Sequence, residues 1–336
     1  MKKHWEEFIM TVELKELKGN ALTVVGTLAE TSLELGTDSN NNEIIKGSIR
    51  VQVKQNDKVN VITLNVYNRK LTKKGTENKL YAGMRTVMEE YVSLQDTNGD
   101  EEKADRVSVN GDLSYNVYSP DGQTVNESNR FRATTLRRVN DKKDLKDGAF
   151  GQIPAVIESY EEELDSEDKP TGLYKVKALT VGYGGRVSRI MDLKVKDDLI
   201  GDMQGFFPEG STGMLYYNIL NYVVVKKQNV DNDGGGSFGQ IHEVVQTNSY
   251  VRQLLVTGGK PLDNSDLDLS EEQVQKAHEE LRKQRTEAIS RSNGQASAPA
   301  QSSSRSGFGG GNNGGTSNPF ANDGSQLNIS DDDLPF

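Results

Sequence analysis

Cysteine is absent from this sequence of 336 residues, and tryptophan occurs only once, at Trp5. Without cysteine, the chain can form no disulfide bond, thiolate metal site or cysteine nucleophile. The three histidines, His4, His242 and His278, lie far apart and follow no zinc-ligand spacing. We therefore expect neither a disulfide-stabilised fold nor a bound metal ion.

Long hydrophobic runs are also missing. No stretch approaches the roughly 20 consecutive apolar residues that a membrane-spanning helix requires. Glu6 and Glu7 stand where a secretory signal peptide would need an apolar segment. We expect a soluble, cytoplasmic protein that does not associate with membranes.

Sequence signatures of enzymes are lacking as well. Gly182-Tyr183-Gly184-Gly185 is followed by a predicted strand, whereas a dinucleotide-binding loop needs the N-terminus of a helix to hold phosphate. The sequence contains no Gly-Lys-Ser/Thr phosphate loop, and its carboxylates form no recognisable acid–base or two-metal arrangement. We expect a protein that is not an enzyme and uses no cofactor.

The formal net charge is −10, but the charges are unevenly distributed along the chain. Residues 1–149 contain equal numbers of basic and acidic side chains, and the excess of acids lies in the remainder. An acidic chain can still bind phosphate groups through a local basic groove. The net charge therefore does not exclude nucleic acid as a partner.

Residues 1–145 are predicted to form a first, β-rich domain. Apolar residues alternate or cluster in short runs bounded by turn residues, as is typical of strands. The predicted strands cover residues 8–17, 21–29, 48–55, 59–67, 106–118 and 129–139. Before the last two strands, apolar residues at helical spacing between Leu80 and Leu94 predict an amphipathic helix. Three strands, a helix and then two strands is the order typical of the five-stranded Greek-key barrel known as the oligonucleotide-binding (OB) fold, which we expect here.

Residues 150–262 repeat much of that order and predict a second, diverged barrel. Its predicted elements are strands at residues 151–162, 172–181, 186–195, 214–225 and 242–256, with a short helix at 197–207. This domain has fewer basic residues than the first. Two roles remain open for it, namely contact with DNA and a protein or oligomer interface. The predicted fold is thus all-β with minor helix, in two tandem OB-fold barrels.

The remainder of the chain is predicted to be a helix, a linker and an acidic tip. Ser270-Glu271-Glu272-Gln273 is a capping box that opens a helix over residues 270–290. This helix packs on a barrel, pairs with a partner helix or acts as a solvated spacer. Residues 291–330 are rich in Gly, Ser, Asn and Gln and are expected to be disordered. The last six residues are Asp331, Asp332, Asp333, Leu334, Pro335 and Phe336. Such a tip suits a pocket with an apolar floor and a basic rim, where Phe336 would be the anchor.

The strand-rich body, the polar linker and the Asp-Asp-Asp-Leu-Pro-Phe ending resemble the bacterial single-stranded DNA-binding protein (SSB) family and its bacteriophage relatives. Leu64 to Leu71 is similar to the third strand of that family, and Val109-Asn110-Gly111-Asp112-Leu113 is similar to its fourth strand. The chain is longer than usual members, which carry one DNA-binding domain. The resemblance implies OB-fold barrels that bind single strands and a tip that binds partner proteins.

Candidate binding residues come from the resemblance and from the chemistry of a single strand. Aromatic rings stack on bases, and Lys and Arg follow the phosphates. The predicted stacking residues are Tyr67, Tyr118, Phe131 and Tyr174. The predicted phosphate contacts are Arg50, Lys54, Lys58, Arg69, Lys70, Arg130, Arg132 and Arg137. Ordinary cross-strand packing is an equal expectation for Tyr67 and Tyr118.

The predicted function is to coat single-stranded DNA without strong sequence preference during replication, recombination and repair. The tip would recruit replication, repair and recombination proteins, and a homodimer would present the four barrels common in the family. The alternative is an interaction module whose tip sequesters host DNA-processing factors. Binding of single strands by the first domain distinguishes the two.

Overall fold

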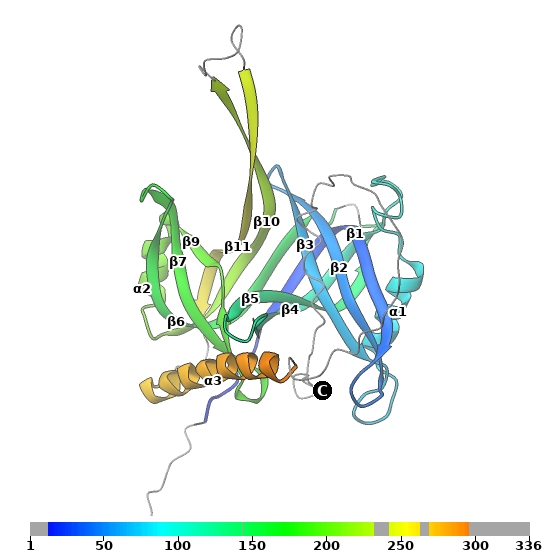
Figure 1. Ribbon diagram of the computed structural model, residues 1–336, viewed down its shortest axis with the longest axis horizontal. Helices are drawn as coiled ribbons and strands as arrows, with labels where there is room; N and C mark the ends of the chain where they lie inside the picture. The colour runs from blue at the N-terminus through cyan, green and yellow to red at the C-terminus, as the bar shows by residue number, and fades with distance from the viewer. Residues whose placement is uncertain (1–12, 143, 232–241, 263–268, 296–336) are drawn as a thin grey trace, which may run out of the picture.

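The computed structural model describes residues 13–142, 144–231, 242–262 and 269–295, with side chains except those of 226–231, 242–247 and 293–295. Two β-barrels lie side by side, a long two-stranded ribbon rises from the second barrel, and a helix crosses below (Figure 1). Within these residues, no helix is both long and apolar enough to cross a membrane.

The first barrel closes through five strands. Its elements are β1 (Ala21–Thr37), β2 (Glu43–Gln55), β3 (Lys58–Arg69), α1 (Lys79–Glu90), β4 (Arg106–Tyr118) and β5 (Asn126–Arg138). The pairings run β1–β2, β2–β3, β3–β5, β5–β4 and β4–β1, and only β3–β5 is parallel. This circuit is the OB fold, so the predicted fold class is confirmed.

The second barrel repeats the circuit with its third strand broken in two. Its elements are β6 (Gly148–Leu164), β7 (Pro170–Val181), the 3₁₀ turn η1 (Tyr183–Gly185), β8 (Val187–Ile190), β9 (Leu193–Lys196), α2 (Asp197–Phe206), β10 (Thr212–Asp231) and β11 (His242–Pro261). The pairings β6–β7, β7–β9, β9–β11, β11–β10 and β10–β6 close it, again with one parallel pair, β9–β11. The single strand predicted at 186–195 is divided at Asp192, whose φ is 56°.

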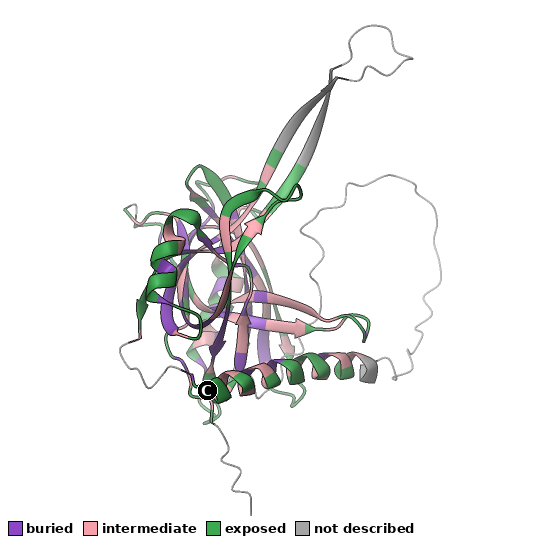
Figure 2. Cartoon of the chain, turned by 90° about the vertical axis from the view of Figure 1, so that its left-hand side faces the viewer, coloured by how far each residue is buried: buried purple, intermediate pink, exposed green. Residues whose placement is uncertain are grey.

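The two barrels share one continuous sheet. Residues 22–25 of β1 pair with β4 on one side, and residues 21–25 pair with residues 148–152 of β6 on the other. Figure 2 shows buried residues concentrated on the strands of the two barrels. The inward side chains are aliphatic, so burial of apolar area stabilises both barrels.

The prediction of a strand at residues 8–17 is wrong for residues 13–17, the part that the structure describes, because they form no strand. Leu17 is buried beside Val181 and Val187, and its backbone N–H donates to the Val181 carbonyl at 2.8 Å. The apolar residues of this segment therefore pack on the second barrel instead of forming a hairpin with β1. Residues 8–12 lie outside the described part of the chain.

Helix α3 (Glu271–Gln295) contacts both barrels and is not a free spacer. Its predicted capping box is present: Ser270 N donates to Gln273 Oε1 at 2.9 Å, and Gln273 N donates to Ser270 Oγ at 3.3 Å. Arg285 pairs with Glu127 of β5 at 3.0 Å, and Gln284 donates to the Val187 carbonyl of β8. The helix thus ties the β4–β5 hairpin to the second barrel.

The nearly buried carboxylate of Asp105 links three segments of the first barrel through hydrogen bonds. Its residue exposure is 6%, and its carboxylate accepts hydrogen bonds from Val92 N, Arg138 Nε and Asn140 Nδ2, each at 2.9 Å. Burial by itself raises the pKa of Asp105, but these hydrogen bonds and the Arg138 charge outweigh it and lower that pKa overall.

We predict that Asp105→Ala lowers the free energy of unfolding by about 2 kcal/mol or more at neutral pH, because it removes three hydrogen bonds to a nearly buried carboxylate, one of them from the charged Arg138. Since the folded pKa is depressed, this contribution is complete above the ordinary aspartate pKa and is lost as the pH falls toward the folded value. Urea unfolding at several pH values measures both effects, and the gap between variant and parent should narrow in acid. Glu167→Gln, which breaks an exposed pair with Lys169, is the control and should change stability by less than about 0.5 kcal/mol.

Candidate nucleic-acid interface

One side of the first barrel, here called the outer face, is lined by polar and basic side chains. Strand alternation sends Ile49, Val51, Ile62 and Leu64 inward, where each is 0% exposed. The intervening residues point outward, and register places them next to one another: Arg50 opposite Thr63, Ser48 opposite Asn65, and Asn65 opposite Arg132. The outer face consists of Ser48, Arg50, Thr63, Asn65, Arg130 and Arg132.

Two arginines of the outer face are held by carboxylates on neighbouring strands. Arg132 makes a two-point contact with Asp112, with Nε to Oδ1 at 3.1 Å and Nη2 to Oδ2 at 2.7 Å. Arg50 Nη1 donates to Glu30 Oε2 at 2.8 Å. All four side chains are partly exposed, with 21–30% of their surface accessible. The guanidinium groups are therefore oriented in advance, but their charge is partly neutralised.

The remaining predicted phosphate contacts are spread around the barrel rather than gathered on the outer face. Lys54 pairs with Glu101 and Lys58 lies above the Tyr222 ring, both near the β2–β3 turn. Arg69 and Lys70 pair with Asp38 and Glu43 at the opposite end of β3.

At that opposite end of β3, acids and bases are paired with one another. Hydrogen bonds from Lys70 and Tyr81 lower the pKa of Glu43. Arg137 is exposed and lies beyond an irregularity in the β4–β5 pairing. Of the eight predicted cations, the structure therefore brings only Arg50, Arg130 and Arg132 together.

The predicted stacking residues differ in exposure. Tyr67 is 8% exposed and packs with Ile44, so its burial does not support base stacking. Phe131 and Tyr174 are half-buried and pack against the core, because strand alternation turns Phe131 inward between the two outward arginines. Tyr118 is 41% exposed at the end of β4, away from the arginines in register.

No sequence pattern indicated that β10 and β11 of the second barrel contact β3 and β5 of the first barrel. The backbone N–H of Asn221 on β10 donates a hydrogen bond to Asn60 Oδ1 at 2.9 Å, and its side-chain Nδ2 donates to the Val61 carbonyl at 2.7 Å. Arg252 of β11 donates to the Asn129 carbonyl at 3.1 Å. These contacts join residues more than 100 positions apart in the sequence, so local sequence periodicity could not predict them.

The described residues contain no group of three or more His, Cys, Asp or Glu side chains that could hold a metal ion. The tip, residues 331–336, and the linker predicted at 291–330 lie outside the described residues, apart from the part of the linker that belongs to α3. The candidate site is therefore a surface of hydrogen-bonding and cationic groups, suited to binding an extended anionic polymer.

Two closed five-stranded barrels joined in tandem place the chain in the class of OB-fold proteins. The chain belongs to the YorF family, whose model matches residues 18–295. None of the curated proteins matches the sequence at a significant level.

Solved structures give distant similarities. The single-stranded DNA-binding protein of Thermus aquaticus has a TM-score of 0.42 and 10% identity, covering 74% of this chain and 96% of that one. Rim1, the mitochondrial single-stranded DNA-binding protein of S. cerevisiae, has a TM-score of 0.23 and 19% identity, covering 39% and 100%. The Plasmodium falciparum SSB in complex with ssDNA has a TM-score of 0.25 and 11% identity, covering 38% and 99%.

Proposed function

We propose that this protein binds single-stranded DNA along the outer face of its first barrel, with little sequence preference. The observation that carries the proposal is the grouping of Arg50, Arg130 and Arg132 among small polar side chains on one side of an OB-fold barrel. Guanidinium groups in such a row suit consecutive phosphates, and short Ser, Thr and Asn side chains leave room for the sugars and bases. No enzymatic step is part of this proposal.

The paired carboxylates determine how strong such binding is. A phosphate that contacts Arg132 or Arg50 must compete with Asp112 or Glu30 for the same donors. Binding then exchanges one anion for another and releases counterions from the strand, so affinity should fall steeply with salt. The scarcity of exposed rings on the outer face favours binding in which phosphate contacts outweigh stacking.

In the cell, we propose that the protein coats single strands during replication, recombination and repair, and that residues 331–336 recruit partner enzymes. The resemblance of this tip to the SSB family supports recruitment. The alternative is that the tip sequesters host DNA-processing proteins without any role for the barrels in DNA binding. A homodimer with four barrels and a cytoplasmic location complete the proposal.

Fluorescence anisotropy of a labelled oligo-dT of about 40 nucleotides, titrated with the full chain at two salt concentrations, tests the proposal. We expect binding to the single strand that weakens steeply with salt, and much weaker binding to a matched duplex. No binding at low salt would rule out the coating function and favour the alternative.

The first prediction about DNA binding concerns the arginines of the outer face. Arg50→Gln with Arg132→Gln should weaken oligo-dT binding at least tenfold, because two phosphate contacts are lost. The slope of log affinity against log salt should become shallower by roughly 0.7 per lost contact. Arg291→Gln, on an exposed pair at the end of α3, is the matched control and should bind like the parent. Equal binding by the double variant would place the site elsewhere.

The second prediction concerns the competing carboxylates. Asp112→Asn should tighten oligo-dT binding about threefold to tenfold at low salt, since Arg132 then meets phosphate without an anionic competitor. The same titration measures this gain. Glu161→Gln is the control, because it removes an acid that pairs with Lys177 on the second barrel. It changes the net charge by the same amount as Asp112→Asn and should raise the affinity for oligo-dT less. A loss of affinity in Asp112→Asn would mean that Asp112 positions Arg132 for DNA.

The third prediction separates the tip from the barrels. Deleting residues 331–336 should leave oligo-dT affinity unchanged or slightly higher at low salt, because three carboxylates that resemble a phosphate run are removed. The same deletion should abolish capture of a helicase or exonuclease by the immobilised protein. Partner capture that survives the deletion would contradict the proposed role of the tip.

A further inference from the structure

The β10–β11 hairpin continues beyond the second barrel as a two-stranded ribbon. The pairing of β10 with β6 ends at Asn218, and the pairing of β11 with β9 begins at Leu254. Beyond these limits, the two strands pair with each other as far as Asp231 on β10 and His242 on β11. Figure 1 shows the ribbon rising beside β3 of the first barrel.

The base of the ribbon is fixed to β3 and β5 of the first barrel, the two strands that carry Asn65 and Arg132 of the outer face. Asn221 donates hydrogen bonds to Asn60 and to the Val61 carbonyl, both on β3. Arg252, directly opposite Asn221 in register, donates to the carbonyl of Asn129, the residue before Arg130. The base of the ribbon therefore lies beside the two strands that carry Asn65, Arg130 and Arg132, and Arg252 contacts the backbone directly before Arg130.

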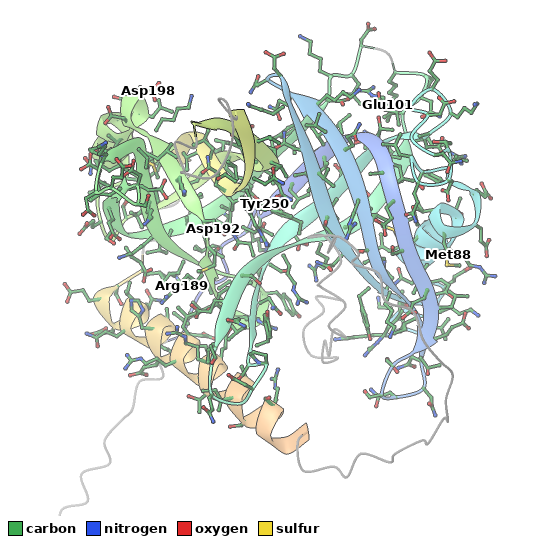
Figure 3. All side chains as sticks on the ribbon, turned by 45° about the horizontal axis from the view of Figure 1, so that its top comes forward. Met88, Glu101, Arg189, Asp192, Asp198 and Tyr250 are labelled. Carbon is green, nitrogen blue, oxygen red and sulfur yellow. The ribbon has the colours of Figure 1, made fainter. Side chains whose placement is uncertain are left out.

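The same side of the ribbon carries exposed apolar and aromatic side chains. Cross-strand partners share a face, so the pair Val223 and Tyr250 lies on the side of the Asn221 and Arg252 pair, two residues further out. Val223 is 37% exposed and Tyr250 is 53% exposed. Figure 3 marks Tyr250 between the strands of the two barrels. We call this surface, made of Val223, Tyr250 and Arg252, the ribbon face.

We propose that the ribbon face is a second wall of the single-strand site, with a base stacked on Tyr250 and a phosphate held by Arg252. This inference rests on the proposed function. The outer face lacks an exposed ring, and the ribbon face supplies one in continuity with it. The Arg252 contact described above is with a neutral carbonyl, whereas Arg50 and Arg132 each face a carboxylate. A strand leaving the first barrel would therefore meet a less neutralised cation and a stacking surface together.

The test compares Tyr250→Ala with the parent as full chains, using oligo-dT of about 10, 20 and 40 nucleotides. We expect Tyr250→Ala to weaken binding of the longest oligonucleotide at least fivefold, with a smaller loss for the shortest. Tyr250→Phe keeps the ring and should bind like the parent. Tyr183→Ala is the matched control, because Tyr183 is 65% exposed in the η1 turn of the second barrel.

Each outcome has one meaning. Parent-like binding by Tyr250→Ala at every length, while the parent itself binds, would overturn the ribbon inference and leave the proposed function intact. Failure of the parent to bind any oligonucleotide would instead overturn the proposed function. A Tyr250→Ala chain that changes from dimer to monomer in sedimentation, with its affinity loss removed at high protein concentration, would assign the ribbon face to a second copy and overturn the inference.

Discussion

The antiparallel pairing of β1 with β6 is the interaction on which the arrangement of the molecule depends. Ala21 to Val25 pairs with Gly148 to Gln152, so a strand of the first barrel is paired directly with a strand of the second. The approach is close at Gly151, where an added Cβ would lie 2.5 Å from the Tyr217 hydroxyl and 2.9 Å from the Ala21 carbonyl oxygen. Only glycine fits there, because both neighbours belong to packed strands. This joint holds the second barrel where its ribbon reaches the first.

The charges of the first barrel are arranged as pairs rather than as a basic patch. Arg50, Arg69 and Arg132 each face a carboxylate within 3.0 Å, in agreement with the balance of charges in this part of the sequence. Such pairs add little stability when they are exposed to water. Their larger consequence is for recognition, because an incoming anion must replace an existing partner. The function proposed for this protein is therefore one of moderate affinity that salt and local charge can tune.

Sequence patterns predicted most of the individual elements but few of the contacts between them. The strand at Arg106–Tyr118, the α2 helix and the capping box of α3 follow from local periodicity and end signals, and all are present. Alternation also placed Arg130 and Arg132 on one side of β5. For Tyr67, the sequence left packing and base stacking equally expected, because the choice depends on contact with Ile44, which only the fold brings near. The anchoring of Asn221 on Asn60 could not be predicted for the same reason. The predicted strands at 214–225 and 242–256 likewise stop short of the 20-residue strands that form the ribbon.

Photo-crosslinking of an iodouridine-substituted single strand to the full chain, with the attachment sites mapped by mass spectrometry, tests the central claim most directly. The account predicts crosslinks on peptides of β3, β5 and the base of the β10–β11 ribbon, which border the outer face. Crosslinks confined to α2, α3 or the β6–β7 hairpin, which lie away from that face, would contradict it.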